Sequence, residues 1–297
     1  MPPRSRKAKQ GSSLAKPKDD GPHASENRTE QHDSPVRSVT YEVPFDKKSI
    51  TCERHGSESG KPGLIFTHGA GGGISNPATK LFAEGSASRD TATVCFEGSM
   101  NLQSRVKAFH AVVEHENGQS AALGGRSMGA RAAVLAAKEH QTQALVLASY
   151  PLIGQNGDLR DQILLEADAD KDILFISGDA DNMCPIERLN RVRAKMKAHT
   201  WLAVVKGADH GMALKPKDAV EKMRIYTGRL AAQWLSKRDS ASTECSLRWD
   251  AHQHEVVDGG WKAPVTSTSV SSKRPPPVRG QQAEDASEGP SKKQKKT

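Results

Sequence analysis

The chain has 297 residues, of which 35% are hydrophobic and only 4% aromatic, and its formal net charge is +8. The positive charge belongs to the two ends, because residues 1–40 contribute +3 and residues 266–297 contribute +4. The near-neutral central part argues against a folded nucleic-acid-binding surface, which needs clustered lysine and arginine side chains facing phosphates.

The composition also suggests how the chain is divided. Residues 1–36 and 266–297 are polar and lack hydrophobic periodicity, so we expect them to be disordered tails, the second of them basic. A folded domain is expected over 37–238, and residues 239–265, with Trp249 and Trp261, form an extension that either packs on the domain or stays loose. The sequence contains no run of about 18 apolar residues, so we expect no transmembrane helix.

Strand-like and helix-like segments alternate along the central part. Residues 38–43 and 49–55 predict an opening hairpin, because β-branched and polar residues alternate there. Further strands are expected at 63–69, 91–97, 121–125, 144–151, 172–178 and 200–208, and helices at 105–116, 128–140, 185–198 and 217–237. The strand at 200–208 is expected to be the last one, followed by a closing helix. This alternation predicts a doubly wound, mostly parallel sheet that binds ligands at the carboxyl ends of its strands.

The sequence GRSMG at residues 125–129 is a G-x-S-x-G motif between an expected strand and an expected helix. In a nucleophile elbow the serine occupies a strained strand-to-helix turn, and the glycines avoid clashes with the neighbouring elements. Such a turn would expose the hydroxyl of Ser127 and leave the backbone N–H of Met128 on the same side, where it can bind an oxyanion. The alternative is a turn serine with a purely structural role.

A serine hydroxyl needs a base, and two other strand ends provide candidates. His210 follows the strand at 200–208, and Asp181 follows the strand at 172–178. We expect His210 to take the serine proton and Asp181 to hold the imidazole in the required tautomer. Asp179 is the alternative acid, whereas Asp209 is expected to be solvated.

The glycine-rich sequence HGAGGG at residues 68–73 follows another strand. Successive glycines let the backbone approach a substrate oxygen, so the N–H of Ala70 or Gly71 is expected to be the second oxyanion donor. A dinucleotide motif would need glycine at position 74, which is Ile74, and no phosphate-binding loop spacing occurs. We therefore expect no cofactor and, because Cys245 and nearby histidines form an incomplete ligand set, no metal.

The stretches FTHGAGGG, GGRSMGAR, SYPL, SGDADN and GADHG together resemble the α/β-hydrolase family that includes the testis-expressed and NSL-complex (non-specific lethal) hydrolase-like proteins. Dienelactone-hydrolase-like enzymes are more distant relatives, and the resemblance covers about 40–236. It implies the α/β-hydrolase fold, with Ser127 as nucleophile, Asp181 as acid and His210 as base. It also places Arg131 in the motif, for which we expect a structural ion pair. The chain reads Gly-Asp-Ala-Asp before the acid, which keeps Asp179 open.

These features predict a serine hydrolase that cleaves an ester or thioester through an acyl-enzyme. Only 20 residues, 152–171, separate two of the expected strands, so no large lid is expected and a small acyl substrate is favoured. The alternative is a non-catalytic hydrolase-fold scaffold or chromatin-complex subunit, because some members of the resembled family are such subunits.

Cellular location and partners depend on other signals. Four cysteines without a CxxC pair indicate reduced, buried thiols, and the amino terminus has no secretory h-region, so an intracellular protein in the nucleus or cytoplasm is expected. The sequence KKQKK at 292–296 resembles a nuclear localisation signal. The tails could bind protein partners or, weakly and non-specifically, nucleic acid.

Overall fold

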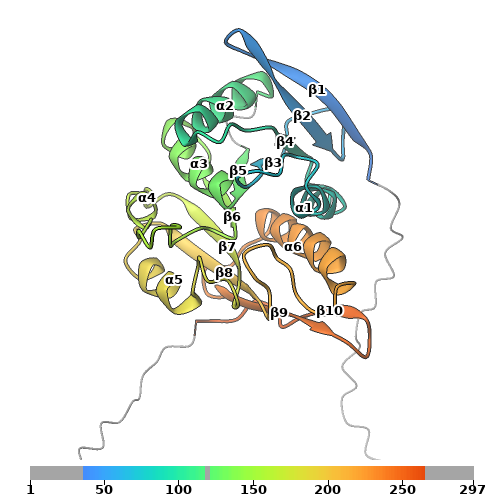
Figure 1. The fold of residues 1–297 in the computed structure, drawn as a ribbon, viewed down its shortest axis with the longest axis vertical. Coiled ribbons are helices and arrows are strands. Elements are labelled where there is room, and N and C mark those ends of the chain that lie inside the picture. The colour runs from blue at the N-terminus through green and yellow to red at the C-terminus, as the bar shows by residue number, and fades with distance from the viewer. Residues whose placement is uncertain (1–35, 118–120, 265–297) are drawn as a thin grey trace, which may run out of the picture.

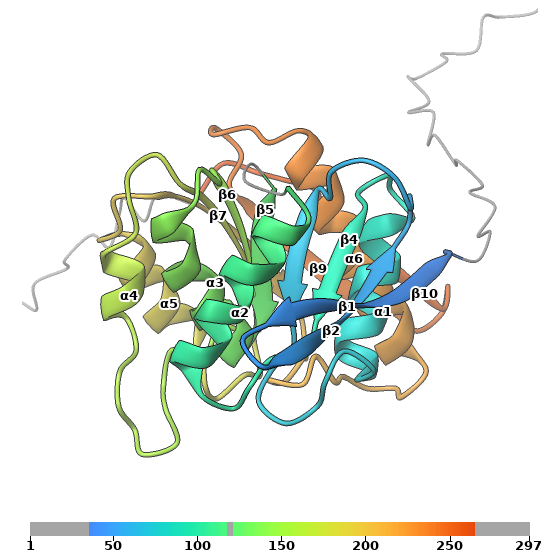
Figure 2. The same cartoon turned by 90° about the horizontal axis from the view of Figure 1, so that it is seen from above.

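A ten-stranded sheet runs through the centre of the molecule and carries helices on both faces (Figures 1 and 2). The structure, a computed structural model, describes residues 36–117 and 121–264, so the two expected tails lie outside the described residues. The strands lie in the order β1-β2-β4-β3-β5-β6-β7-β8-β9-β10. Their bounds are β1 Ser38–Phe45, β2 Lys48–His55, β3 Leu64–Thr67, β4 Thr93–Phe96, β5 Ala122–Arg126, β6 Ala144–Ala148, β7 Asp172–Gly178, β8 His199–Val205, β9 Glu244–Asp250 and β10 Glu255–Asp258.

Seven neighbouring strands of this sheet, from β4 through β3 and β5 to β9, pair in parallel. The two edges are antiparallel, because β1 pairs with β2, β2 with β4, and β9 with β10 in that sense. The predicted opening hairpin and the predicted doubly wound, mostly parallel sheet are therefore confirmed.

Helices cover the sheet in two layers, each with its own hydrophobic core. The helices are α1 Pro77–Ala87, α2 Leu102–His115, α3 Met128–Ala136, α4 Gln162–Leu165, α5 Ile186–Arg193 and α6 Ala219–Ser236, with a 3-10 turn, η1, at Ala137–Glu139. One layer contains α2, α3, α4 and α5, and the other contains α1 and α6. Strand β3 serves both cores, because Ile65 points into the first and its neighbours Leu64 and Phe66 into the second. Both faces being covered explains its unbroken apolar sequence.

The expectation that 200–208 holds the last strand is wrong. Strand β9 continues the parallel sheet beside β8, and β10 turns back against it, so the sheet reaches beyond residue 238. The physical reason is visible in β9, where Cys245 and Leu247 enter the second core and the intervening residue is polar. Trp249 and Trp261 pack against the same core, as one of the two expectations held.

Two helices were not predicted from the sequence. Helix α4 is a single turn, and α1 contains Gly85, a poor helix former, among few large apolar residues. Helix α1 begins with Pro77, and the side chain of Asn76 caps it by accepting a hydrogen bond from the N–H of Ala78 at 2.9 Å.

The thiols fit the expectation from the sequence. All four cysteines are free and buried, and burial raises the pKa of Cys184 to about 12. Across 36–117 and 121–264, no helix is both long and apolar enough to cross a membrane.

Two glycines allow α1 and α6 to touch backbone to backbone. A Cβ on Gly85 would lie 2.0 Å from the carbonyl oxygen of Ile225, and a Cβ on Gly228 would lie 2.0 Å from that of Phe82. No side chain, however small, fits between the two helices at these points.

Substitution of Gly85 tests this packing. In an exposed helix, a change from glycine to alanine stabilises by about 1 kcal/mol. Here Gly85→Ala should instead lower the free energy of unfolding by about 1–3 kcal/mol, because the methyl group pushes the helices apart. Denaturant unfolding measures the change, with Lys80→Ala on the exposed side of α1 as the control. An unchanged or raised stability of Gly85→Ala would contradict the described contact.

Candidate active site

The segments predicted to hold the site follow four parallel strands, β3, β5, β7 and β8, at the carboxyl ends of these strands. Only β6 lies between β5 and β7 in the sheet. Parallel strands end on the same edge, so side chains that are 83 and 29 positions apart in sequence come into contact there.

Ser127 lies at the sharp turn between β5 and α3. Its backbone has φ 52° and ψ −114°, a conformation that costs about 1–3 kcal/mol for a non-glycine residue. The turn is possible because its flanking residues are glycines. A Cβ on Gly125 would lie 2.4 Å from the carbonyl carbon of Gly129, and a Cβ on Gly129 would lie 2.5 Å from the carbonyl oxygen of Thr67 in β3.

The structure brings Ser127, Asp181 and His210 together. Nε2 of His210 lies 2.8 Å from Oγ of Ser127, and Nδ1 lies 2.8 Å from Oδ2 of Asp181. A carboxylate only accepts hydrogen bonds, so Nδ1 carries the proton and Nε2 is free to accept from the serine hydroxyl. Asp181 is only 2% exposed, and its second oxygen accepts the backbone N–H of Met183 at 2.8 Å. This arrangement can withdraw the serine proton as the hydroxyl reacts.

The two other aspartates have different partners. Oδ1 of Asp179 accepts the N–H of Gly207 at 2.6 Å, and Oδ2 lies 3.3 Å from Nζ of Lys206. Asp209 is exposed and accepts two backbone N–H groups of its own turn. Of the two acids left open by the sequence, Asp181 is therefore the one that contacts His210.

The loop after β3 lies beside the serine. A Cβ on Gly69 would lie 3.4 Å from Cβ of Ser127, so the loop passes the serine with space for little more than a methyl group between them. Met128 is the first residue of α3, and the N–H groups of a first helical turn have no partner within the helix. Ala70 and Met128 both line the cavity at Ser127, whereas Gly71, with φ 68°, is not among its lining residues. Of the two residues expected to supply the second oxyanion donor, Ala70 therefore lines the cavity and Gly71 does not.

A buried arginine that the sequence analysis did not identify binds the loop after β3. Arg105 of α2 is fully buried and donates hydrogen bonds to four carbonyl oxygens. Its Nη1 bonds the carbonyls of His68 and Gly69, while Nε bonds that of Ser99 and Nη2 that of Gly98, so one side chain joins the loops after β3 and β4. Burial lowers the pKa of Arg105 to about 10.

His68 completes the link between the two loops. Its Nε2 accepts the N–H of Gly98 at 2.9 Å, and its Nδ1 lies 2.6 Å from the carbonyl oxygen of Gly69, to which it donates. Burial and then the charge of Arg105 lower the pKa of His68, and the hydrogen bond to Gly69 and the carboxylate of Glu97, 3.1 Å away, offset this only in part. A neutral imidazole suits both hydrogen bonds.

Two arginines of the GGRSMGAR stretch also reach the site. Nη2 of Arg126 donates to the backbone carbonyl of His210 and so holds the histidine loop, and burial lowers the pKa of Arg126 to about 10. The expected structural ion pair of Arg131 is wrong. Within the described part of the chain this guanidinium forms no ion pair or hydrogen bond, and its Nε is buried without a partner.

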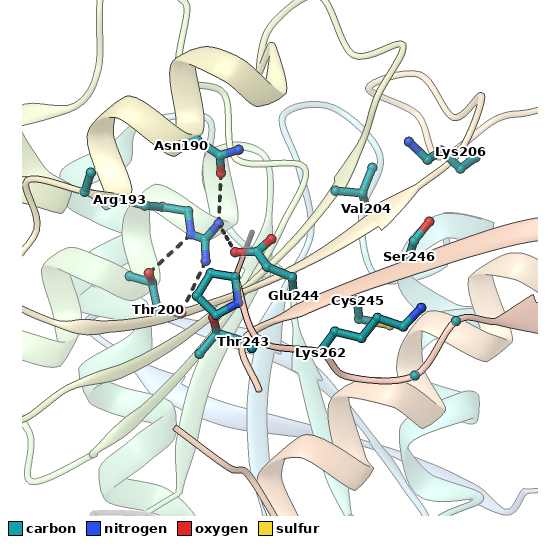
Figure 3. A pocket seen from close by; sticks show the side chains of 15 residues that line it. Asn190, Arg193, Thr200, Val204, Lys206, Thr243, Glu244, Cys245, Ser246 and Lys262 are labelled. Atoms are coloured by element: carbon teal, nitrogen blue, oxygen red, sulfur yellow. Dashed lines mark hydrogen bonds and ion pairs between the residues drawn. The ribbon is translucent and has the colours of Figure 1, made fainter. Parts of the chain in front are cut away.

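The site opens into a cavity of about 500 Å³ that contains Ser127 and His210 in its wall. No cluster of three or more His, Cys, Asp and Glu side chains that could hold a metal ion occurs among the residues described. A larger cavity, of about 860 Å³, lies away from this site, between α5, β8 and β9 (Figure 3).

Comparison with known proteins agrees with the fold described above. The sequence model of the alpha/beta hydrolase domain family matches residues 60–234. Est1E from Butyrivibrio proteoclasticus has 16% identity and a TM-score of 0.52, with 69% of this chain and 100% of that chain covered. A dienelactone hydrolase from Anabaena variabilis has 16% identity and a TM-score of 0.53, with coverages of 68% and 98%. An α/β serine hydrolase without a lid from Xanthomonas campestris has 17% identity, a TM-score of 0.53 and coverages of 69% and 98%. At these identities the similarity is one of fold.

The role of Arg105 can be tested by stability. Lysine cannot reach four carbonyl oxygens on two loops, so Arg105→Lys leaves buried acceptors unpaired and should lower the free energy of unfolding by roughly 2–4 kcal/mol. The reverse exchange at an exposed position of the same helix, Lys107→Arg, should change it by less than about 0.5 kcal/mol. If Arg105→Lys and the unaltered protein had equal unfolding curves, the role of Arg105 as the link between the two loops would be contradicted.

Proposed function

Because the chain belongs to the alpha/beta hydrolase domain family, we propose that it is a serine hydrolase that cleaves an ester or thioester. The observation that carries the proposal is the continuous hydrogen-bonded chain from the Ser127 hydroxyl through His210 to the buried carboxylate of Asp181. A serine in a strained, glycine-flanked turn that touches a correctly oriented imidazole has the requirements of a nucleophile.

In the first half of the proposed reaction, His210 takes the proton of Ser127 as the oxygen attacks the carbonyl carbon. The oxyanion that forms is bound by the N–H of Met128 and that of Ala70, with Gly71 as the alternative to Ala70. Asp181 keeps Nδ1 protonated and stabilises the imidazolium. The tetrahedral intermediate then collapses, and His210 gives its proton to the departing alcohol or thiol.

In the second half, water replaces the leaving group. His210 removes a proton from the water as it attacks the acyl-serine, and the same N–H groups bind the second oxyanion. The second tetrahedral intermediate then collapses, His210 returns its proton to the oxygen of Ser127, and the acid is released. No step requires a cofactor.

The shape of the site supports a small acyl substrate. The cavity has a volume of about 500 Å³, within the lower range for ligand pockets. The segment between β6 and β7, where a lid could be inserted, holds only the single turn α4. Short acyl esters or thioesters are therefore favoured over long-chain lipids.

Within the family, we propose that the chain is related to the testis-expressed and NSL-complex hydrolase-like proteins, on the motifs quoted above. The alternative that this relationship raises is a non-catalytic nuclear scaffold. The KKQKK sequence and the tails, which would carry nuclear import and contacts with protein or nucleic acid, lie outside the described residues. These roles stay predictions.

Replacement of the serine tests the enzyme proposal. Ser127→Ala removes the nucleophile and should lower kcat for a short-chain ester by at least about 10³-fold without altering the unfolding curve. A fluorophosphonate probe should label the unaltered protein and the exposed-site control Ser59→Ala, but not Ser127→Ala. If the unaltered protein takes no label under conditions in which a known esterase does, the scaffold alternative replaces the enzyme.

Replacement of the acids tests the assignment of Asp181. Asp181→Asn cannot hold the imidazole in the required tautomer, so kcat should fall by about 10²–10⁴-fold. Asp179→Asn, two residues away, should stay within about threefold of the unaltered protein, because Asp179 contacts Gly207 and Lys206 instead. The reverse ranking of the two variants in steady-state assays would transfer the role to Asp179.

A further inference from the structure

The cavity at Ser127 has an unusual charge distribution. Three arginines, Arg126, Arg131 and Arg160, line it, and no aspartate or glutamate does. Much of the remaining wall is apolar, with Met100, Leu102, Pro151 and Met183 among the lining residues. A cavity of this kind attracts a ligand that combines an apolar body with a negative charge.

Two of the three guanidinium groups already have partners. Nε of Arg160 lies 2.9 Å from Oδ2 of Asp158, and Nη2 of Arg126 donates to the carbonyl of His210. After burial, the charge of Arg224 lowers the pKa of Arg126, whereas the charges of Asp181 and Asp209 raise it. These two arginines therefore have roles in holding the loops.

Arg131 differs from both. It donates no hydrogen bond and forms no ion pair within 36–117 and 121–264, and its Nε is buried with no acceptor. Burial, and then the charge of Arg160, lower the pKa of Arg131, which indicates an environment unfavourable to its charge. A partly buried guanidinium is costly unless an anion pairs with it.

The larger cavity shows how this chain treats an arginine that has a structural role (Figure 3). Arg193 lies in the wall of that cavity and is fully engaged. It forms an ion pair with Glu244 at 2.9 Å and hydrogen bonds with the side chains of Asn190 and Thr200. Nε of Arg126 is also buried without a partner, but Arg126 uses Nη2 on the carbonyl of His210, whereas Arg131 has no partner on any of its nitrogens among the residues described.

We propose that Arg131 binds a carboxylate of the substrate, so that the preferred ester or thioester is one whose acyl group ends in a carboxylate. The inference rests on the proposed hydrolase function. Arg131 lies four residues after Ser127, one turn along α3, and helical side chains tilt toward the amino-terminal end of their helix. A bound acyl chain would place its carbonyl at Ser127 and its carboxylate at Arg131, with the apolar wall beside its methylene groups.

The charge balance favours a singly charged group. Arg160 is paired with Asp158, and Nη2 of Arg126 is used by the carbonyl of His210, so Arg131 is the one arginine of the cavity wall, among the residues described, with no hydrogen bond or ion pair. A guanidinium binds a carboxylate through two parallel hydrogen bonds. A dianionic phosphate would need a second free cation.

Matched esters test the proposal. Monomethyl succinate, glutarate and adipate differ from methyl butanoate, pentanoate and hexanoate mainly in carrying a carboxylate in place of the terminal methyl group. For the full chain, kcat/KM should be at least about tenfold higher for the carboxylate member of the best pair. Arg131→Ala should lower this preference ratio by about ten- to hundredfold, because a charge-assisted hydrogen-bonded contact is lost. Arg191→Ala, an exposed arginine on α5, is the matched control and should leave the ratio unchanged.

A binding measurement separates this proposal from the enzyme proposal. Titration calorimetry with glutarate on Ser127→Ala should detect binding that disappears in the Ser127→Ala, Arg131→Ala double variant, whose fold is checked by its unfolding curve. Ester cleavage without a carboxylate preference, or a ratio unchanged in Arg131→Ala, would overturn the carboxylate site and leave the hydrolase standing. Arginine-dependent glutarate binding by a protein that cleaves no ester would support the carboxylate site and overturn the hydrolase.

Discussion

The close contact of α3 with β3 is the constraint on which the site depends. Gly129 is the contact point, because the space that its side chain would fill is occupied by the carbonyl oxygens of Thr67 and His68. This contact, together with the one at Gly125, forces the chain through the turn at Ser127 with a positive φ. The strained backbone persists because the strand on one side and the helix on the other both fix its position. The reactivity proposed for the serine is thus a consequence of backbone packing.

The carbonyl group of His68 takes part in this contact, and the side chain of Arg105 donates a hydrogen bond to the same carbonyl. Fully buried arginines are rare unless all their donors are used, and Arg105 uses its donors on two loops. The loops after β3 and β4 are therefore joined through one side chain. The oxyanion donor proposed in the loop after β3 is supported in this way, and a donor fixed before the reaction needs no reorganisation when charge develops.

Much of this could be predicted from the sequence because local patterns carry it. Apolar runs that end in chemically active residues predicted that Ser127, Asp181 and His210 follow strands. Because parallel strands end on the same edge of a sheet, the three side chains could be expected to lie close together. Asp179 and Asp181 both follow β7 and are only two residues apart, so the sequence does not show which of them faces His210. That choice required the course of the loop after β7. The role of Arg105 could not be predicted, because a single arginine in a helical pattern is normally expected on the solvent-exposed face. The two strands after residue 238 were not predicted, because the long helix α6 was interpreted as the last element of the domain.

The short helix α3 contributes several of the positive features of the cavity. Its first residue, Met128, presents a backbone N–H, its amino-terminal end carries the positive part of the helix dipole, and Arg131 adds a full charge one turn later. Because these groups belong to one rigid turn, a substrate anchored by its carboxylate is also oriented relative to the Ser127 hydroxyl. Binding energy from a remote anchor accelerates the reaction only when it fixes the geometry of the reacting atoms, beyond tightening binding alone. The proposed anchor meets that condition, since Arg131 lies on the helix that begins directly after the proposed nucleophile, Ser127.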